Sequence, residues 1–138
     1  MTYKKGITII NICSSGMLLA HGFLKNLFEV FAKHEVVVDV LATSEVSVSL
    51  TVEGEVAQEV LDDLGALGVV ESYPEMAIVC LVGAGVRGDA EVLGNLFSAI
   101  SDHDVSMVSQ GASKRNITFL VQEAEAKTVV SKIFNQFF

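Results

Sequence analysis

The stretch LKNLFEVFAKHEVVVDVLATSEVSVSLTV, residues 24–52, recurs without a gap as LGNLFSAISDHDVSMVSQGASKRNITFLV, residues 93–121. The offset is 93 − 24 = 69 residues, and both copies carry an Asn-Leu-Phe triplet and a histidine at matching places. Such a repeat indicates two copies of one supersecondary unit. A unit of roughly 65 residues buries only about 60% of its unfolded surface and is marginal alone. We therefore expect the copies to pack on one another or on a partner, and the chain to form an oligomer.

Hydrophobic periodicity predicts the same order of elements in both copies. Alternating or β-branched apolar runs predict strands, and apolar residues three or four positions apart predict amphipathic helices. In the first copy the predicted strands are residues 7–13, 36–41, 46–52 and 69–73, and the predicted helices are residues 17–34 and 56–64. In the second copy they are strands 76–82, 105–110 and 117–121 and helices 89–102 and 123–137. The single proline, Pro74, is expected to stop the strand before it and to form the joint between the copies.

The predicted fold class is α+β. A βαββαβ unit closes most simply as a four-stranded antiparallel sheet with both helices on one face, the ferredoxin-like arrangement. The second copy is one strand short, and residues 1–5 are expected to supply a stub of its fourth strand. The first unit would then be inserted into the second. The predicted domains are residues 6–75, and residues 76–138 together with residues 1–5.

Composition and charge argue against several classes of function. The net charge is −8 and no basic face is evident, which speaks against a nucleic-acid partner. No run of 18 apolar residues and no secretion leader are found, so we expect no membrane segment and a cytoplasmic protein. Cys13 and Cys80 lie far apart in apolar runs and are predicted to be reduced core thiols. No cluster of residues at metal-ligand spacing and no nucleophile–base pair stand out, so no metal, cofactor or catalytic residue is predicted.

The segment GAGVRG, residues 83–88, fits the GxGxxG pattern between a predicted strand and a predicted helix. Dinucleotide binding also requires a carboxylate after the next strand and further parallel strands. Here the next predicted strand ends in Gln110, and only one more strand follows. A plain strand-to-helix loop is the simpler interpretation, and a nucleotide-dependent enzyme is kept as an alternative.

Asp39 interrupts an otherwise apolar predicted strand, residues 36–41. A charge there is costly unless it is solvated or paired. It marks either an edge strand with one wet face or a carboxylate awaiting a cationic ligand. The repeat aligns Asp39 with Val108, so a site at Asp39 would exist in one copy only. His34 and His103 end corresponding helices, where the helix dipole favours them.

At this point the residues resemble a known family. The run Met17-Leu18, Gly22-Phe23-Leu24, Val38-Asp39 and Thr43-Ser44-Glu45 resembles the first ACT domain of lysine-sensitive aspartokinases, and Gly111-Ala112-Ser113 with residues 116–121 resembles the second. The resemblance implies two ACT domains, one inserted in the other, that bind an amino acid as allosteric effector at the interface of a homodimer. It also implies a catalytic domain upstream that is absent from this chain. We therefore expect a regulatory piece that is not an enzyme alone, with a standalone amino-acid-binding module as the alternative.

Matched position by position, the resemblance implies a set of contacts to L-lysine, or to another small amino acid. The set is Met17, Ala20, Phe23, Leu24, Val37, Val38, Asp39, Thr43, Ser44 and Glu45. Asp39 and Glu45 are the carboxylates for the two ammonium groups. The hydroxyls of Thr43 and Ser44 would fix orientation, although turn hydroxyls more commonly bond the local backbone. Family members commonly have serine at the position of Ala20, so the identity of the effector stays open.

Overall fold

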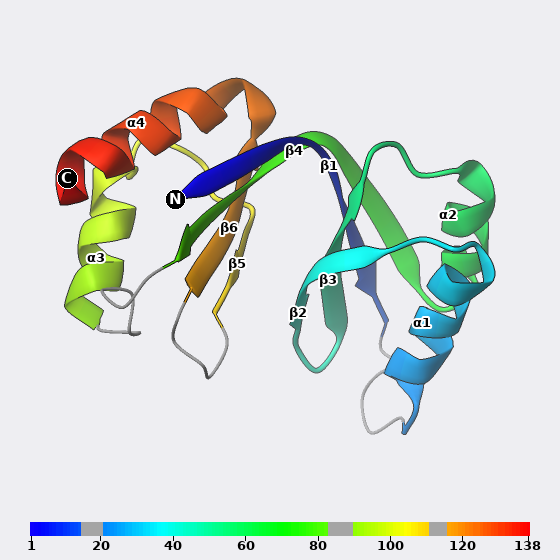
Figure 1. The fold of residues 1–138 in the computed structure, drawn as a ribbon. Coiled ribbons are helices and arrows are strands. Elements are labelled where there is room, and N and C mark those ends of the chain that lie inside the picture. The colour runs from blue at the N-terminus through cyan, green and yellow to red at the C-terminus, as the bar shows by residue number, and fades with distance from the viewer. Residues whose placement is uncertain (15–20, 83–89, 111–115) are drawn as a thin grey trace. The chain divides into compact units, whose positions relative to one another are not determined.

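A computed structural model describes residues 1–14, 21–82, 90–110 and 116–138 (Figure 1). The chain divides into two compact units, a first unit of Gly6–Pro74 and a second unit of Met1–Lys5 with Glu75–Phe138. The strands are β1 (Thr2–Cys13), β2 (Val38–Thr43), β3 (Ser47–Glu53), β4 (Val69–Val82), β5 (Met107–Ser109) and β6 (Asn116–Gln122). The helices are α1 (Phe23–Lys33), α2 (Gln58–Gly65), α3 (Ala90–Ala99) and α4 (Ala126–Phe137), the last preceded by a 3-10 turn over Glu123–Glu125.

The strand registers reproduce the sequence repeat. The strand order is β2-β3-β1-β4 in the first unit and β1-β4-β6-β5 in the second, because β1 and β4 each contribute residues to both units. β1 pairs antiparallel with β3 so that Ile7 lies opposite Glu53. β4 pairs antiparallel with β6 so that Met76 lies opposite Gln122. Both partners are 69 residues further on (76 − 7 and 122 − 53), so the two units share one pairing pattern.

The buried side chains of each unit lie between its strands and its two helices, which cover one face of the strands (Figure 1). The first core consists of Ile10, Ile12, Leu27, Phe31, Val48, Leu50, Val52, Val60 and Leu64. The second consists of Ala77, Val79, Leu81, Leu96, Ile100, Ile117, Phe119, Val121, Ala126, Val129 and Ile133. These are every second strand residue and every third or fourth helix residue, as one-sided burial requires. The predicted antiparallel sheet with helices is thus confirmed.

The prediction that Pro74 stops a strand is wrong, because β4 runs without interruption from Val69 to Val82. Proline lacks an N–H, and a strand tolerates it where no ladder bond is needed. The irregularity appears one residue later, where Glu75 takes a left-handed backbone conformation with φ 58°. The prediction for Cys13 is also wrong in part, since Cys13 is exposed at the end of β1. Cys80 is half-buried, and both thiols are free.

Three predicted elements have different bounds. β2 begins at Val38 rather than at residue 36, and β5 covers only Met107–Ser109 of the predicted residues 105–110. α1 begins at Phe23, after Gly22 in the left-handed conformation at φ 78°, where the sequence predicts a start at residue 17. No helix of the described residues is long and apolar enough to span a bilayer.

Candidate functional site

β2, the outer strand of the first unit, carries a β-bulge at Asp39. Val38 lies opposite Val52 and Leu41 lies opposite Leu50, three residues apart on β2 but two apart on β3. One extra residue is therefore inserted into β2 between Val38 and Leu41. A bulge of this kind turns the side chains beside it away from their regular alternation and is common next to binding sites.

A buried hydroxyl holds the bulge. The backbone N–H of Val40 donates to Thr51 Oγ1 at 2.9 Å, and Thr51 is fully buried. The bulge breaks the regular ladder, and the hydroxyl takes the place of the lost carbonyl acceptor, because a buried N–H without a partner is costly. The sequence pattern places Thr51 on the wet face of its strand, and its burial was not anticipated. The signal that could have found it is its counterpart in the repeat, the apolar Leu120.

The second unit has no such bulge. Met107 lies opposite Leu120 and Val108 lies opposite Phe119, with no shift of register. Phe119 is the repeat counterpart of Leu50, so Val108 takes the place of Leu41 and not that of Asp39. The gap-free alignment of Asp39 with Val108 is therefore wrong in space, and Met107 stands where the bulge would be. The second unit still offers no acid at this place.

Asp39 is exposed on the outer strand, which agrees with the interpretation of an edge strand with a solvated carboxylate. Among the described residues no Lys, Arg or His forms an ion pair with Asp39. Thr43 and Glu45, also exposed, follow at the end of β2 and in the turn to β3. Three polar side chains of the predicted site are thus presented to solvent along one edge of the first unit.

The turn between β2 and β3 is fixed by short hydrogen bonds. The N–H of Ser44 donates to the carbonyl of Ser47 at 2.9 Å, and the two Ser hydroxyls lie 2.9 Å apart. The N–H of Ser14, just after β1, donates to the carbonyl of Val46 at 2.9 Å. The local-bonding interpretation is therefore confirmed for Ser44. The turn that presents Glu45 is tied to the end of β1.

The start of α1 supplies the other described members of the predicted set. No side chain caps this helix and no acid occupies its first turn, so its first N–H groups face no competing carboxylate. Phe23 and Val38 are half-buried, whereas Leu24 is 41% and Val37 81% exposed. In the view of Figure 1 the start of α1 and the β2–β3 turn lie at the same, lower end of the first unit. Met17, Ala20, the 83–88 motif and residues 111–115 lie outside the described residues.

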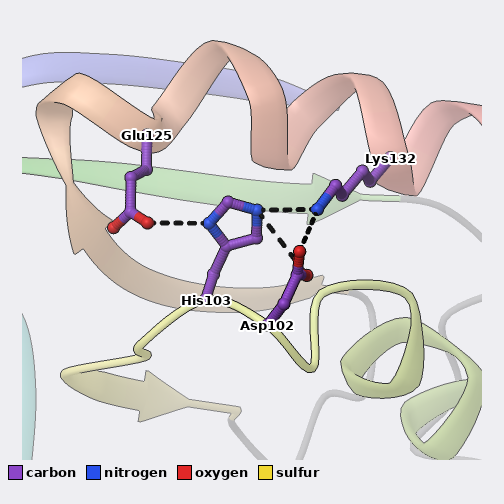
Figure 2. Close-up of polar contacts among 4 residues, drawn as sticks. All are labelled: Asp102, His103, Glu125 and Lys132. Carbon is purple, nitrogen blue, oxygen red and sulfur yellow. Dashed lines mark hydrogen bonds and ion pairs between the residues drawn. The ribbon is translucent and has the colours of Figure 1, made fainter.

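Each unit also ties its two helices together with a polar cluster at matching places. In the first unit His34 Nε2 lies 2.7 Å and Lys33 Nζ 3.2 Å from Asp63 Oδ2. In the second unit Lys132 Nζ lies 2.6 Å from Asp102 Oδ2 (Figure 2). At the offset of 69, Lys33 corresponds to Asp102 and Asp63 to Lys132. The salt bridge has therefore reversed its polarity between the units.

Figure 2 shows His103 between Glu125 and Lys132. The Lys132 ammonium donates to His103 Nε2 at 3.0 Å, which leaves Nδ1 to carry the proton that is donated to Glu125 Oε1 at 2.8 Å. The predicted positions of His34 and His103 at helix ends are confirmed, and their partners are charged groups near or on the adjacent helix. The described residues contain no group of three or more His, Cys, Asp or Glu that could hold a metal ion.

Acid should weaken these helix clusters. The hydrogen bond from His34, with that from Lys33, holds the pKa of Asp63 below its ordinary 3.8, and Lys132 does the same to Asp102. A lowered folded pKa gives stability that is complete above the unfolded pKa and is lost as the pH falls through the folded pKa. We expect Asp63→Asn to lower the free energy of unfolding at about pH 6 but not at about pH 2, as measured by urea titration. Glu59→Gln, exposed on the same helix, is the control, and an equal loss at both pH values would contradict the prediction.

Comparison with known proteins gives one consistent answer. A family model described as an ACT domain matches residues 79–137. A C-terminal regulatory domain of aspartate kinase from Porphyromonas gingivalis W83 is 33% identical, with a TM-score of 0.85 over 99% of this chain and 95% of that chain. E. coli aspartokinase III in complex with lysine and aspartate (T-state) is 34% identical, with a TM-score of 0.84 over 99% of this chain and 32% of that chain.

Aspartokinase 1, chloroplastic, from Arabidopsis thaliana is 38% identical over 98% of this chain but only 26% of its own length. The chain thus spans about a quarter to a third of the curated relatives it matches, such as the lysine-sensitive aspartokinase 3 of E. coli at 33%. Its fold agrees with a regulatory domain of that enzyme class along nearly its whole length. This chain belongs to the family of ACT-domain regulatory regions of aspartate kinases.

Proposed function

We propose that the chain senses L-lysine with its first unit and acts as the regulatory region of a longer aspartokinase. The observation that carries the proposal is the bulge of β2, which presents Asp39 in the first unit and has no counterpart among the described residues of the second. A relative 34% identical to this chain has been solved in complex with lysine and aspartate. These two facts favour a cationic amino acid as effector and a site in only one unit.

The chemistry of the predicted set matches the groups of lysine. Asp39 and Glu45 can each receive one ammonium group, and a charge-assisted hydrogen bond contributes about 1.5–3 kcal/mol. The uncapped start of α1 at Phe23 and Leu24 suits the carboxylate, because free N–H groups and the helix dipole attract anions. Exposed apolar surface at Leu24 and Val37 suits the aliphatic stem of the ligand.

The proposal extends to the domain arrangement. The first unit would be one ACT domain inserted into a second, an arrangement supported by the unit boundaries at Lys5/Gly6 and Pro74/Glu75. Two chains would associate through these domains, with lysine bound where the first units meet. The exposed apolar side chains on and beside the outer strand, Leu24, Val37 and Val46, are consistent with such an interface.

In the intact protein a kinase domain would precede this region and phosphorylate aspartate. Lysine would then inhibit the kinase by stabilising an arrangement of the two chains in which the kinase is less active. Control of this kind requires lysine to bind the two states with different affinity. The affinity ratio sets the largest possible inhibition.

Titration calorimetry of the chain with lysine, threonine, methionine and leucine tests the proposal. We expect heat of binding and a rise in melting temperature with lysine only, since only lysine brings a second ammonium group for the second carboxylate. At a concentration 100 times the Kd, binding stabilises the folded state by about 2.7 kcal/mol. A response to threonine, methionine or leucine without one to lysine would show that the assigned effector is wrong.

A further inference from the structure

The connection between α2 and β4 touches the end of β1 at Gly68. A Cβ atom added to Gly68 would lie 2.6 Å from the carbonyl oxygen of Cys13 and 2.9 Å from Cβ of Ser14. Close carbon–oxygen contacts between strands are about 3.3–3.6 Å, so the backbone could not stay in place. Only glycine allows this approach.

The backbone that Gly68 touches is the same one that anchors the β2–β3 turn. Cys13 is the last residue of β1 and lies opposite Ser47. The next residue, Ser14, donates its N–H to the carbonyl of Val46. Ser47 in turn accepts from the N–H of Ser44 and bonds its hydroxyl. A displacement of residues 13–14 would therefore pass directly to the turn that carries Ser44 and Glu45.

We infer that Gly68 is a positioning residue for effector binding, an inference that rests on the proposed function. Gly68 lies outside the predicted contact set and 23 residues beyond Glu45 in the sequence (68 − 45). It acts through the end of β1 rather than by touching the ligand. A set of polar groups misplaced by a fraction of an ångström to 1 Å binds poorly even when every member is present.

The test compares Gly68→Ala with Gly65→Ala in the same chain. Gly65 ends α2, and a Cβ added there meets nothing within 4 Å, so this variant is a matched control. Calorimetry with L-lysine should show an affinity about tenfold lower for Gly68→Ala and within about twofold of the parent for Gly65→Ala. Amide NMR spectra without ligand should show shifts at residues 13–14 and 44–47 for Gly68→Ala only.

A second control separates positioning from general loss of stability. Val60→Ala removes buried apolar volume from α2 in the core of the same unit without touching Cys13 or Ser14. It should lower the melting temperature while lysine affinity stays within about twofold. If Gly68→Ala binds lysine like the parent, or loses affinity only as Val60→Ala does, the inference is overturned. If the parent chain itself does not bind lysine, the proposed function fails and the inference fails with it.

Discussion

Asp39→Asn is expected to weaken L-lysine binding about tenfold to a hundredfold, because it removes the charge from a charge-assisted hydrogen bond of about 1.5–3 kcal/mol. Asparagine keeps the size and shape of the side chain, so the bulge and the fold should persist. Titration calorimetry measures the affinity, and thermal unfolding without ligand checks the fold.

Glu55→Gln is the matched control for Asp39→Asn. Glu55 is an exposed acid of the first unit that follows β3 and lies outside the predicted contact set, so its neutralisation changes net charge by the same amount. Its lysine affinity should equal that of the parent, which excludes a general electrostatic effect. Unchanged binding in Asp39→Asn would show that Asp39 does not contact the effector.

Thr51→Val should damage both stability and lysine binding. The substitution replaces the hydroxyl that accepts from Val40 N–H with a methyl group and leaves a buried donor without a partner. Such a loss costs about 1–3 kcal/mol in the free energy of unfolding. The bulge would also lose its support, so Asp39 would no longer be held and lysine affinity should fall by about tenfold. Urea unfolding and calorimetry measure the two effects.

Two further variants make the Thr51 experiment specific. Thr51→Ser keeps the hydroxyl and should retain most of the lysine affinity. Thr118→Val makes the same chemical change in β6 of the second unit, where the Thr118 hydroxyl meets only Cys80 Sγ at 3.5 Å, and should leave lysine binding unchanged. Equal affinity in Thr51→Val and the parent would refute the role of this hydroxyl.

The repeat carried most of the fold. Once residues 24–52 were seen to recur, one pattern of strands and helices described both halves, and the registers of β1–β3 and β4–β6 agree with it. Pro74 was misread because a local rule, that proline stops strands, gave way to the position of the residue in the strand. The bounds of β2 and β5 shifted by one to three residues, since edge pairing depends on partners that periodicity does not contain.

The candidate site was only partly predictable. Asp39 could be singled out because a charge in an apolar run requires an explanation, and Ser44 because turns favour hydroxyls. Thr51 and Gly68 could not, because their importance lies in contacts with residues 11 and 55 positions away (51 − 40 and 68 − 13). An alternating strand does not distinguish an exposed threonine from a buried one that satisfies a bulge. A gap-free alignment cannot reveal an inserted residue that a shorter connection compensates.

The reversed salt bridges have a consequence for the ancestry of the repeat. A graft of α4 onto α1 would set Lys132 against Lys33, and a graft of α2 onto α3 would set Asp63 against Asp102. Either chimera places like charges together at a contact that attracts in the parent. The two halves, nearly interchangeable in backbone, have thus become incompatible as spare parts, and recombination between them within a gene would be selected against.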